Sequence, residues 1–192
     1  MLNLAVFASG GGTNLQSILD ACLSGALSAK VVAVISNNSA AYALERARRA
    51  GIRAFHISRK THIGETEYIE AISSLMLENE IGLIILAGYM KLLPVPIVRE
   101  YYGRIINIHP ALLPNYGGPG MYGLDVHRAV LASKDKHSGA TVHIVDEKYD
   151  HGPILIQRIV PVMPADSPET LAARVLEIEH QILPMAIPLY IR

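Results

Sequence analysis

The sequence predicts an α/β fold: a Rossmann-like open, mostly parallel twisted sheet with helices on both faces. Short runs rich in β-branched residues alternate with longer stretches of helical periodicity, and this alternation is typical of βαβ units. The run Gly82–Ala87 is continuously apolar, as expected of a strand that is covered on both faces. The 192 residues are expected to form one domain, residues 1–192.

The strands are predicted from short runs of β-branched and other apolar residues. In chain order they are Leu2–Ala8, Val31–Ser36, Arg53–Ile57, Gly82–Ala87, Arg104–Ile108, Ala140–Val145 and Ile154–Val160. The helices between them are predicted from apolar residues that recur every three or four positions. They are Leu15–Cys22, Ala40–Ala50, Thr66–Asn79, Pro94–Tyr101, Leu124–Ser133 and a terminal helix that begins at Ser167.

Residues at the ends of these segments support the assignment. Ser167 and Pro168 are typical of the N-cap and the first position of a helix, and Gly51 is typical of the residue after a helix end. Pro110–Gly123 is rich in proline and glycine, which predicts a loop.

Composition and charge argue against several classes of protein. Hydrophobic residues make up 51% and charged residues 18%, which is too apolar for a disordered chain. The 17 basic and 17 acidic residues leave no net charge, so no nucleic-acid partner is expected. No apolar run is long enough to span a membrane, so no membrane partner is expected either. The single cysteine, Cys22, favours a reducing compartment, and the chain shows neither a signal peptide nor a membrane-spanning run. A cytoplasmic location is therefore expected.

The first candidate site is the glycine-rich turn Ser9–Asn14, which follows the first predicted strand. Its glycines let backbone N–H groups approach an anion at a helix N-terminus, and Thr13 and Asn14 add side-chain donors. The turn lacks the spacing of a dinucleotide fingerprint and the ending of a P-loop. It fits a phosphate site and also fits a purely structural turn.

The second and third candidate sites are Asn107–Pro114 and Val145–Pro153. Strand alternation sends Asn107 and His109 to the same side, so that an amide and an imidazole converge. The alternative is a buried histidine with only a structural role. In the later segment, Asp150 is expected to orient His109, with Asp146 and Glu147 as rival candidates and a plain solvated turn as the alternative.

The histidines do not follow the spacing of a metal site, and Ser9 is not part of a nucleophile elbow. No metal is therefore expected. A hydrolase that forms a covalent enzyme intermediate is also poorly supported.

Taken together, four segments resemble the phosphoribosylglycinamide formyltransferases: Ser9–Asn14, Ala87–Lys91, Asn107–Pro114 and Asp150–Pro153. The resemblance implies the formyltransferase fold and transfer of a formyl group from the co-substrate 10-formyltetrahydrofolate to the amine of glycinamide ribonucleotide, in de novo purine biosynthesis. Both partners are then small molecules, and the protein is a monomer or a homodimer. The Asn107–Pro114 pattern is shared with methionyl-tRNA formyltransferase, so it identifies the chemistry better than the acceptor.

The resemblance also implies roles for individual residues. Residues about 1–100 would bind the nucleotide phosphate, and residues about 101–192 would be catalytic and would bind folate. Catalysis would fall to Asn107, His109 and Asp150. The ribonucleotide would be bound by Gly11, Gly12, Thr13, Asn14 and Glu179. Folate would be bound by Tyr89, Met90, Lys91, Leu92, Leu93, Asn107, Val145 and Asp146.

Two segments depart from the family pattern. Gly64–Thr66 lacks the basic residue that many relatives have there, and Arg59 or Lys60 is the expected substitute. The loop Asn115–Gly123 is long and rich in glycine, which suggests a mobile flap. Two other functions remain open: a formyltetrahydrofolate hydrolase and a non-catalytic nucleotide-binding module.

Overall fold

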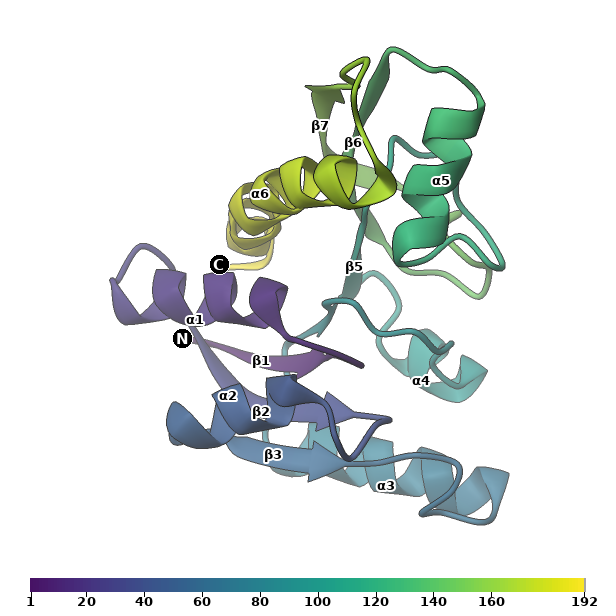
Figure 1. Cartoon of the computed structure of the whole chain (residues 1–192). Coiled ribbons are helices and arrows are strands. Elements are labelled where there is room, and N and C mark those ends of the chain that lie inside the picture. The colour runs from purple at the N-terminus through teal and green to yellow at the C-terminus, as the bar shows by residue number, and fades with distance from the viewer. Residues whose placement is uncertain (192) are drawn as a thin grey trace.

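A seven-stranded sheet forms the centre of the computed structural model, which describes residues 1–191 (Figure 1). The strands are β1 (Leu2–Phe7), β2 (Ala29–Ser36), β3 (Arg53–His56), β4 (Leu83–Leu86), β5 (Ile105–His109), β6 (His137–Ile144) and β7 (Ile154–Pro161). Their order is β3-β2-β1-β4-β5-β6-β7. The first five strands pair in parallel, while β6 and β7 join antiparallel. The predicted mostly parallel sheet is confirmed.

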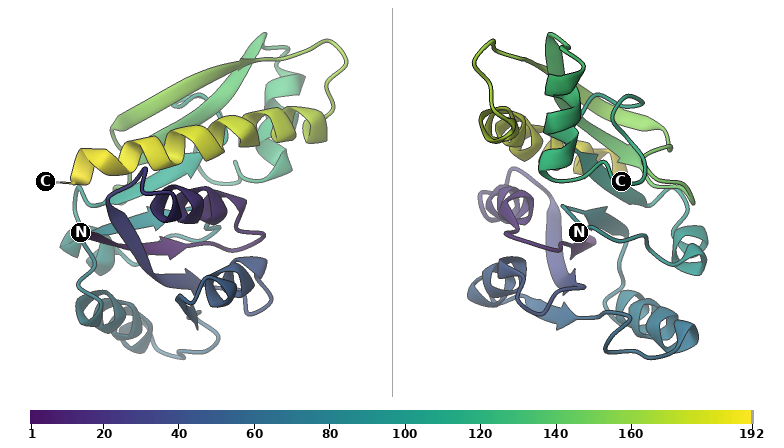
Figure 2. Two further views of the ribbon diagram at one scale, coloured as in Figure 1. Left: turned by 90° about the vertical axis from the view of Figure 1, so that its left-hand side faces the viewer. Right: turned by 45° about the vertical axis from the view of Figure 1, so that its right-hand side comes forward.

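Helices cover both faces of the sheet (Figure 2). They are α1 (Thr13–Leu23), α2 (Tyr42–Arg49), α3 (Glu65–Glu78), α4 (Val95–Glu100), α5 (Leu124–Ala132) and α6 (Pro168–Ala186), followed by the 3₁₀ helix η1 (Ile187–Tyr190). Buried residues of α1, α2, α5 and α6 pack in one cluster, and those of α3 and α4 pack in the other. Along β1, Leu4 and Val6 join the first cluster, whereas Ala5 and Phe7 join the second. The continuous apolar runs are therefore explained by burial on both faces.

The predicted elements are all present, with ends that differ by a few residues. The largest difference is in β6, which begins at His137 rather than Ala140. The polar start of this strand has little strand preference of its own, but it pairs with β7 from His137 opposite Pro161 onward. Tertiary pairing thus extended the strand. At α6, the predicted start is confirmed, because Ser167 and Thr170 form a reciprocal capping box.

The strand order places the candidate residues together at the carboxyl ends of the central parallel strands. β1 lies between β2 and β4, so the chain leaves β1 in one direction and returns to its other side after β3. Ligands of open α/β sheets bind at such a reversal, outside the carboxyl ends of the strands. The turn after β1, the segment after β4 and the end of β5 at His109 all lie at these carboxyl ends. Within residues 1–191, no helix is long and apolar enough to cross a membrane.

Candidate active site

A cavity of about 460 Å³ opens at the carboxyl ends of the central strands. Its walls come from the segments after β4 and β5, the loop between β6 and β7, and one side of α6. All the residues predicted for folate line it: Tyr89, Met90, Lys91, Leu92, Leu93, Asn107, Val145 and Asp146. Met90 is 46% exposed whereas Leu93 belongs to the core, so the two differ in how much surface they offer to a ligand.

His109 and Asp150 meet in the wall of this cavity. Nδ1 of His109 lies 3.5 Å from Oδ1 of Asp150, and the histidine is only 3% exposed. Nε2 of His109 donates to the carbonyl oxygen of Tyr116 at 2.7 Å. Because a carbonyl oxygen only accepts, the Nε2 proton is retained, and Nδ1 is the atom turned toward the carboxylate.

The structure distinguishes the three acidic residues of the loop between β6 and β7. Asp150 faces His109, whereas Asp146 pairs with His151 at 2.9 Å and Glu147 pairs with Arg99 at 2.7 Å. Asp150 also accepts the backbone N–H of Gly118 at 2.9 Å. The predicted contact between Asp150 and His109 is therefore present, and the two rival carboxylates are occupied elsewhere.

Asn107 joins the same cluster through its side-chain amide. Its Nδ2 lies 3.4 Å from Asp150 Oδ1 and donates to Nε2 of His143 at 3.1 Å. His143 Nδ1 in turn donates to the carbonyl oxygen of Ile144 at 2.9 Å. Asn107, His109 and Asp150 are thus brought together as predicted.

His143 is a member of the cluster that the sequence analysis did not select. It lies opposite Asn107 in the antiparallel pairing of β5 with β6, and its Nε2 is 3.5 Å from Asp150 Oδ1. Only the register of these two strands would have identified it. Other cavity residues that were not predicted to bind a substrate include Val98, Met121, Tyr122 and His127.

Burial and charge oppose each other in this cluster. Burial lowers the pKa of His109, while the charge of Asp150 and the Tyr116 carbonyl raise it, and the lowering prevails. Burial raises the pKa of Asp150, but the nearby His143, the charge of His109 and the Gly118 N–H together hold it below its usual value. Asp150 is therefore a carboxylate at neutral pH, and His109 depends on it to carry a proton.

The turn after β1 has the geometry of an anion site. Gly12 precedes α1 with φ at 72°, and a Cβ placed on it would lie 2.7 Å from Cβ of Ala43, so glycine is required there. No side chain caps α1, so the N-terminal N–H groups of this helix are not occupied by a capping group. Arg46 donates from Nε to the Gly11 carbonyl at 2.8 Å and holds the turn against α2.

Asn14 and Glu179 connect this turn with the cavity. Nδ2 of Asn14 donates to Oε2 of Glu179 at 2.6 Å, and Glu179 lines the cavity while being only 8% exposed. Burial raises the pKa of Glu179 to about 7, against the lowering effect of Asn14. Oδ1 of Asn14 is buried and has no hydrogen-bond partner within residues 1–191, which leaves it as an acceptor.

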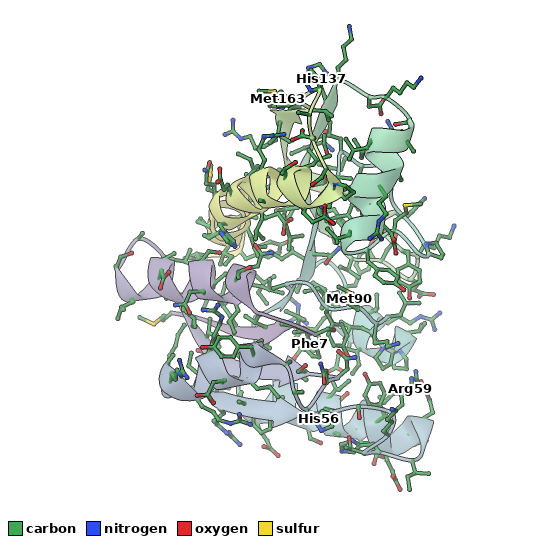
Figure 3. The ribbon with its side chains drawn as sticks, viewed as in Figure 1. Phe7, His56, Arg59, Met90, His137 and Met163 are labelled. Carbon is green, nitrogen blue, oxygen red and sulfur yellow. The ribbon has the colours of Figure 1, made fainter. Side chains whose placement is uncertain are left out.

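A second cavity adjoins the first through Lys91 and Leu92. Its wall contains His56, Arg59 and Lys60, and Figure 3 shows His56 and Arg59 beside α3, below Met90. The Arg59 guanidinium pairs with Glu65 and lies 5.0 Å from the centre of the Tyr68 ring. Of the two expected substitutes for the missing basic residue, Arg59 is thus already paired. Lys60 forms no ion pair with any residue that the structure describes.

Across residues 1–191, no group of three or more histidine, cysteine, aspartate or glutamate side chains is arranged to hold a metal ion.

Comparison with known proteins identifies the family. A model of the family described as formyl transferase matches residues 2–187. A phosphoribosylglycinamide formyltransferase of Haemophilus influenzae is 44% identical over 97% of this chain and 86% of its own length. A chloroplastic phosphoribosylglycinamide formyltransferase of Vigna unguiculata is also 44% identical, but this chain spans only 57% of its length.

Solved structures agree with these matches. A glycinamide ribonucleotide transformylase from Symbiobacterium toebii superposes with a TM-score of 0.90 at 42% identity, over 97% of this chain and 86% of that one. A formyltetrahydrofolate deformylase from Pseudomonas syringae reaches 0.86 at 26% identity, over 97% of this chain and 60% of that one. The resemblance and the fold predicted from the sequence motifs are confirmed: this chain belongs to the formyltransferase family.

Proposed function

We propose that this protein transfers the formyl group of 10-formyltetrahydrofolate to the primary amine of glycinamide ribonucleotide. The observation that carries the proposal is the cluster of Asn107, His109 and Asp150 in the wall of a cavity that also reaches Glu179. The names and identities of the relatives support the same activity.

The reaction begins when the amine nitrogen attacks the formyl carbon and the C=O electron pair moves to oxygen. The resulting tetrahedral oxyanion is stabilised by Asn107 Nδ2 and by the protonated imidazole of His109, because donors aimed at developing charge act most strongly where that charge appears. Asp150 supports the charged imidazole and accepts the proton that the amine loses, through water. Cleavage of the bond between the formyl carbon and the folate nitrogen then releases tetrahydrofolate, whose nitrogen takes up, through water, the proton that Asp150 had accepted.

The acceptor is assigned to the side of the cavity near α1. The N-terminal N–H groups of α1 bind its phosphate, and Glu179 accepts from its ribose hydroxyls. The buried Oδ1 of Asn14, which has no partner in residues 1–191, supports a ligand donor at this place. Folate would occupy the side lined by Met90 and Val145.

The carboxylates of folate are assigned to the second cavity. Since Arg59 is paired with Glu65, Lys60 and Lys91 are the cations proposed to meet them. The cytoplasm remains the proposed location, in keeping with the single cysteine. Monomer and homodimer remain the two proposed assemblies.

The rival activity is hydrolysis of the same co-substrate, as in the deformylase that this chain resembles at lower identity. The test mixes the protein with 10-formyltetrahydrofolate and follows tetrahydrofolate, with and without glycinamide ribonucleotide. We expect release only when the amine is present. Release without the amine would favour the hydrolase, and no release in either case would favour a nucleotide-binding module.

A further inference from the structure

We infer that Tyr116 is a positioning residue for His109. Its hydroxyl is held at the end of α5, and this holds its carbonyl oxygen on Nε2 of His109, so that Nδ1 faces Asp150. The inference rests on the proposed role of His109 in formyl transfer. It gives a function to a loop that sequence analysis treated only as a flap.

Tyr116 is attached at both ends. Its side-chain hydroxyl contacts the carboxylate of Asp135 and the hydroxyl of Ser133, just after α5. Its backbone oxygen accepts the Nε2 proton of His109 at 2.7 Å. Its φ of 56° lies in the left-handed region, which a non-glycine residue adopts only when its surroundings hold it there. The attachment to the end of α5 supplies that restraint.

The next two residues extend the same arrangement to Asp150. Gly118 donates its backbone N–H to Asp150 Oδ2 at 2.9 Å. A Cβ placed on Gly117 would lie 2.7 Å from Leu113 Cδ2 and 3.1 Å from Asp150 Cβ, so the loop passes close against the carboxylate. Three consecutive residues therefore set the positions of both His109 and Asp150.

The chemical consequence concerns which imidazole nitrogen titrates. With Nε2–H given to a carbonyl oxygen, the neutral ring turns an unprotonated Nδ1 toward Asp150, and only the charged ring offers an N–H there. Without the carbonyl, the neutral ring would place its proton on Nδ1, donate to Asp150 and remain uncharged. The Tyr116 carbonyl thus couples the carboxylate to the charged form, and it raises the pKa of His109 against the effect of burial.

Three other titratable groups face His109. Asp150 and His143 face it from the β6–β7 side, and the buried His127 faces it from α5. Among the residues that the structure describes, His127 and His143 have no hydrogen bond to this loop, whereas Asp150 is bound by Gly118, so the ¹⁵N shifts of the His109 ring are needed beside the pH profile to identify the effect of the carbonyl.

The test uses Tyr116→Phe, which removes the hydroxyl that attaches the loop to the end of α5 and keeps the ring, and Asp135→Asn, which removes the charge of the hydroxyl's partner and keeps its size. Tyr102→Phe is the matched control, because Tyr102 is 78% exposed and lies outside the cavity. Turnover is measured from pH 5 to 9, and ¹⁵N chemical shifts of the His109 ring are recorded in the intact protein. Thermal unfolding verifies that each variant is folded.

We expect the pH limb that follows His109 to move to lower pH in Tyr116→Phe, with turnover at neutral pH reduced about 5- to 10-fold, the usual worth of one hydrogen bond. Asp135→Asn, which weakens the attachment without removing it, should move the limb in the same direction but less far. The ¹⁵N shifts at high pH should change from the Nε2–H form toward the Nδ1–H form. Asp135→Glu, which keeps a carboxylate, should restore part of both. The Michaelis constants of the two substrates should stay within about twofold, because Tyr116 does not line the cavity.

The inference about Tyr116 would be overturned if folded Tyr116→Phe kept the pH profile and the His109 tautomer of the wild type and His109→Ala nevertheless lost turnover. If His109→Ala instead kept its turnover, the proposed role of His109 would fail. The ¹⁵N shifts would then still decide whether Tyr116 sets the ring.

Discussion

Replacing Asp150 with asparagine removes one charge from the cluster and leaves its shape nearly intact. The substituted amide keeps an oxygen that accepts the Gly118 N–H, which Asp150 accepts at 2.9 Å in the structure. It no longer offers a full negative charge 3.5 Å from Nδ1 of His109. We therefore expect Asp150→Asn to fold normally and to lose turnover.

The size of the loss follows from that distance. At 3.5 Å, and with an effective dielectric constant of about 20, the interaction between a carboxylate and an imidazolium is worth at most about 5 kcal/mol. Each 1.4 kcal/mol corresponds to about a factor of ten in rate, so the upper limit is about 3 × 10³-fold. Since burial lowers the pKa of His109 and Asp150 opposes that effect, the loss should be largest at neutral and alkaline pH.

Steady-state release of tetrahydrofolate gives the turnover, and thermal unfolding gives the stability. Asp125→Asn serves as the control, because Asp125 is exposed and pairs with Arg128 outside the cavity. His109→Ala should lower turnover by about 10²–10⁴-fold. The variant that carries both substitutions should lose much less turnover than the product of the two single losses, since the two residues act as one unit. Turnover of Asp150→Asn within about threefold of the wild type would show that the charge of Asp150 does not support His109.

Three further changes test other parts of the site. Thr13→Val should raise the Michaelis constant for the ribonucleotide but not for folate, and inorganic phosphate should compete more weakly; equal effects on both substrates would contradict a phosphate site at α1. The pKa of Glu179 is raised from 4.5 to about 7, so its contribution to stability is fully present below pH 4.5 and is lost as the pH rises to about 7. Between these two pH values the free energy of unfolding of the wild type should fall by about 3 kcal/mol relative to that of Glu179→Gln. Urea titration at each pH measures this difference. If the free energies of unfolding of the two proteins changed in parallel with pH, the raised pKa of Glu179 would be contradicted. Gly152→Ala should lower the melting temperature and turnover together, because its Cβ would lie 1.9 Å from the backbone oxygen of Ile144; a variant with unchanged melting temperature would show that the turn can adjust.

Much of the fold could be predicted because its signals are local. Apolar runs give the strands, three- and four-residue spacing gives the helices, and Ser167 with Pro168 marks the start of α6. The start of β6 is an exception. The first residues of β6, from His137 onward, have no local strand signal and are extended only because β7 pairs with them.

The candidate site divides in the same way. Local sequence patterns were enough to predict the glycine turn before α1, the pair Asn107 and His109 on one side of β5, and the three acidic residues among which a partner for His109 had to lie. Each of these follows from short-range geometry, namely the allowed conformations of glycine and the two-residue period of a strand.

The folded arrangement of the strands and loops selects which of those acidic residues contacts His109, and it brings His143 to them. It also brought Asn14 to Glu179, which are 165 positions apart in the sequence, and it turned the Tyr116 carbonyl toward His109. These contacts depend on the antiparallel register of β5 with β6 and on the packing of α6 against α1. Register and packing are set by the burial of whole strands and helices, so no short stretch of sequence contains the distances between the side chains that they bring together.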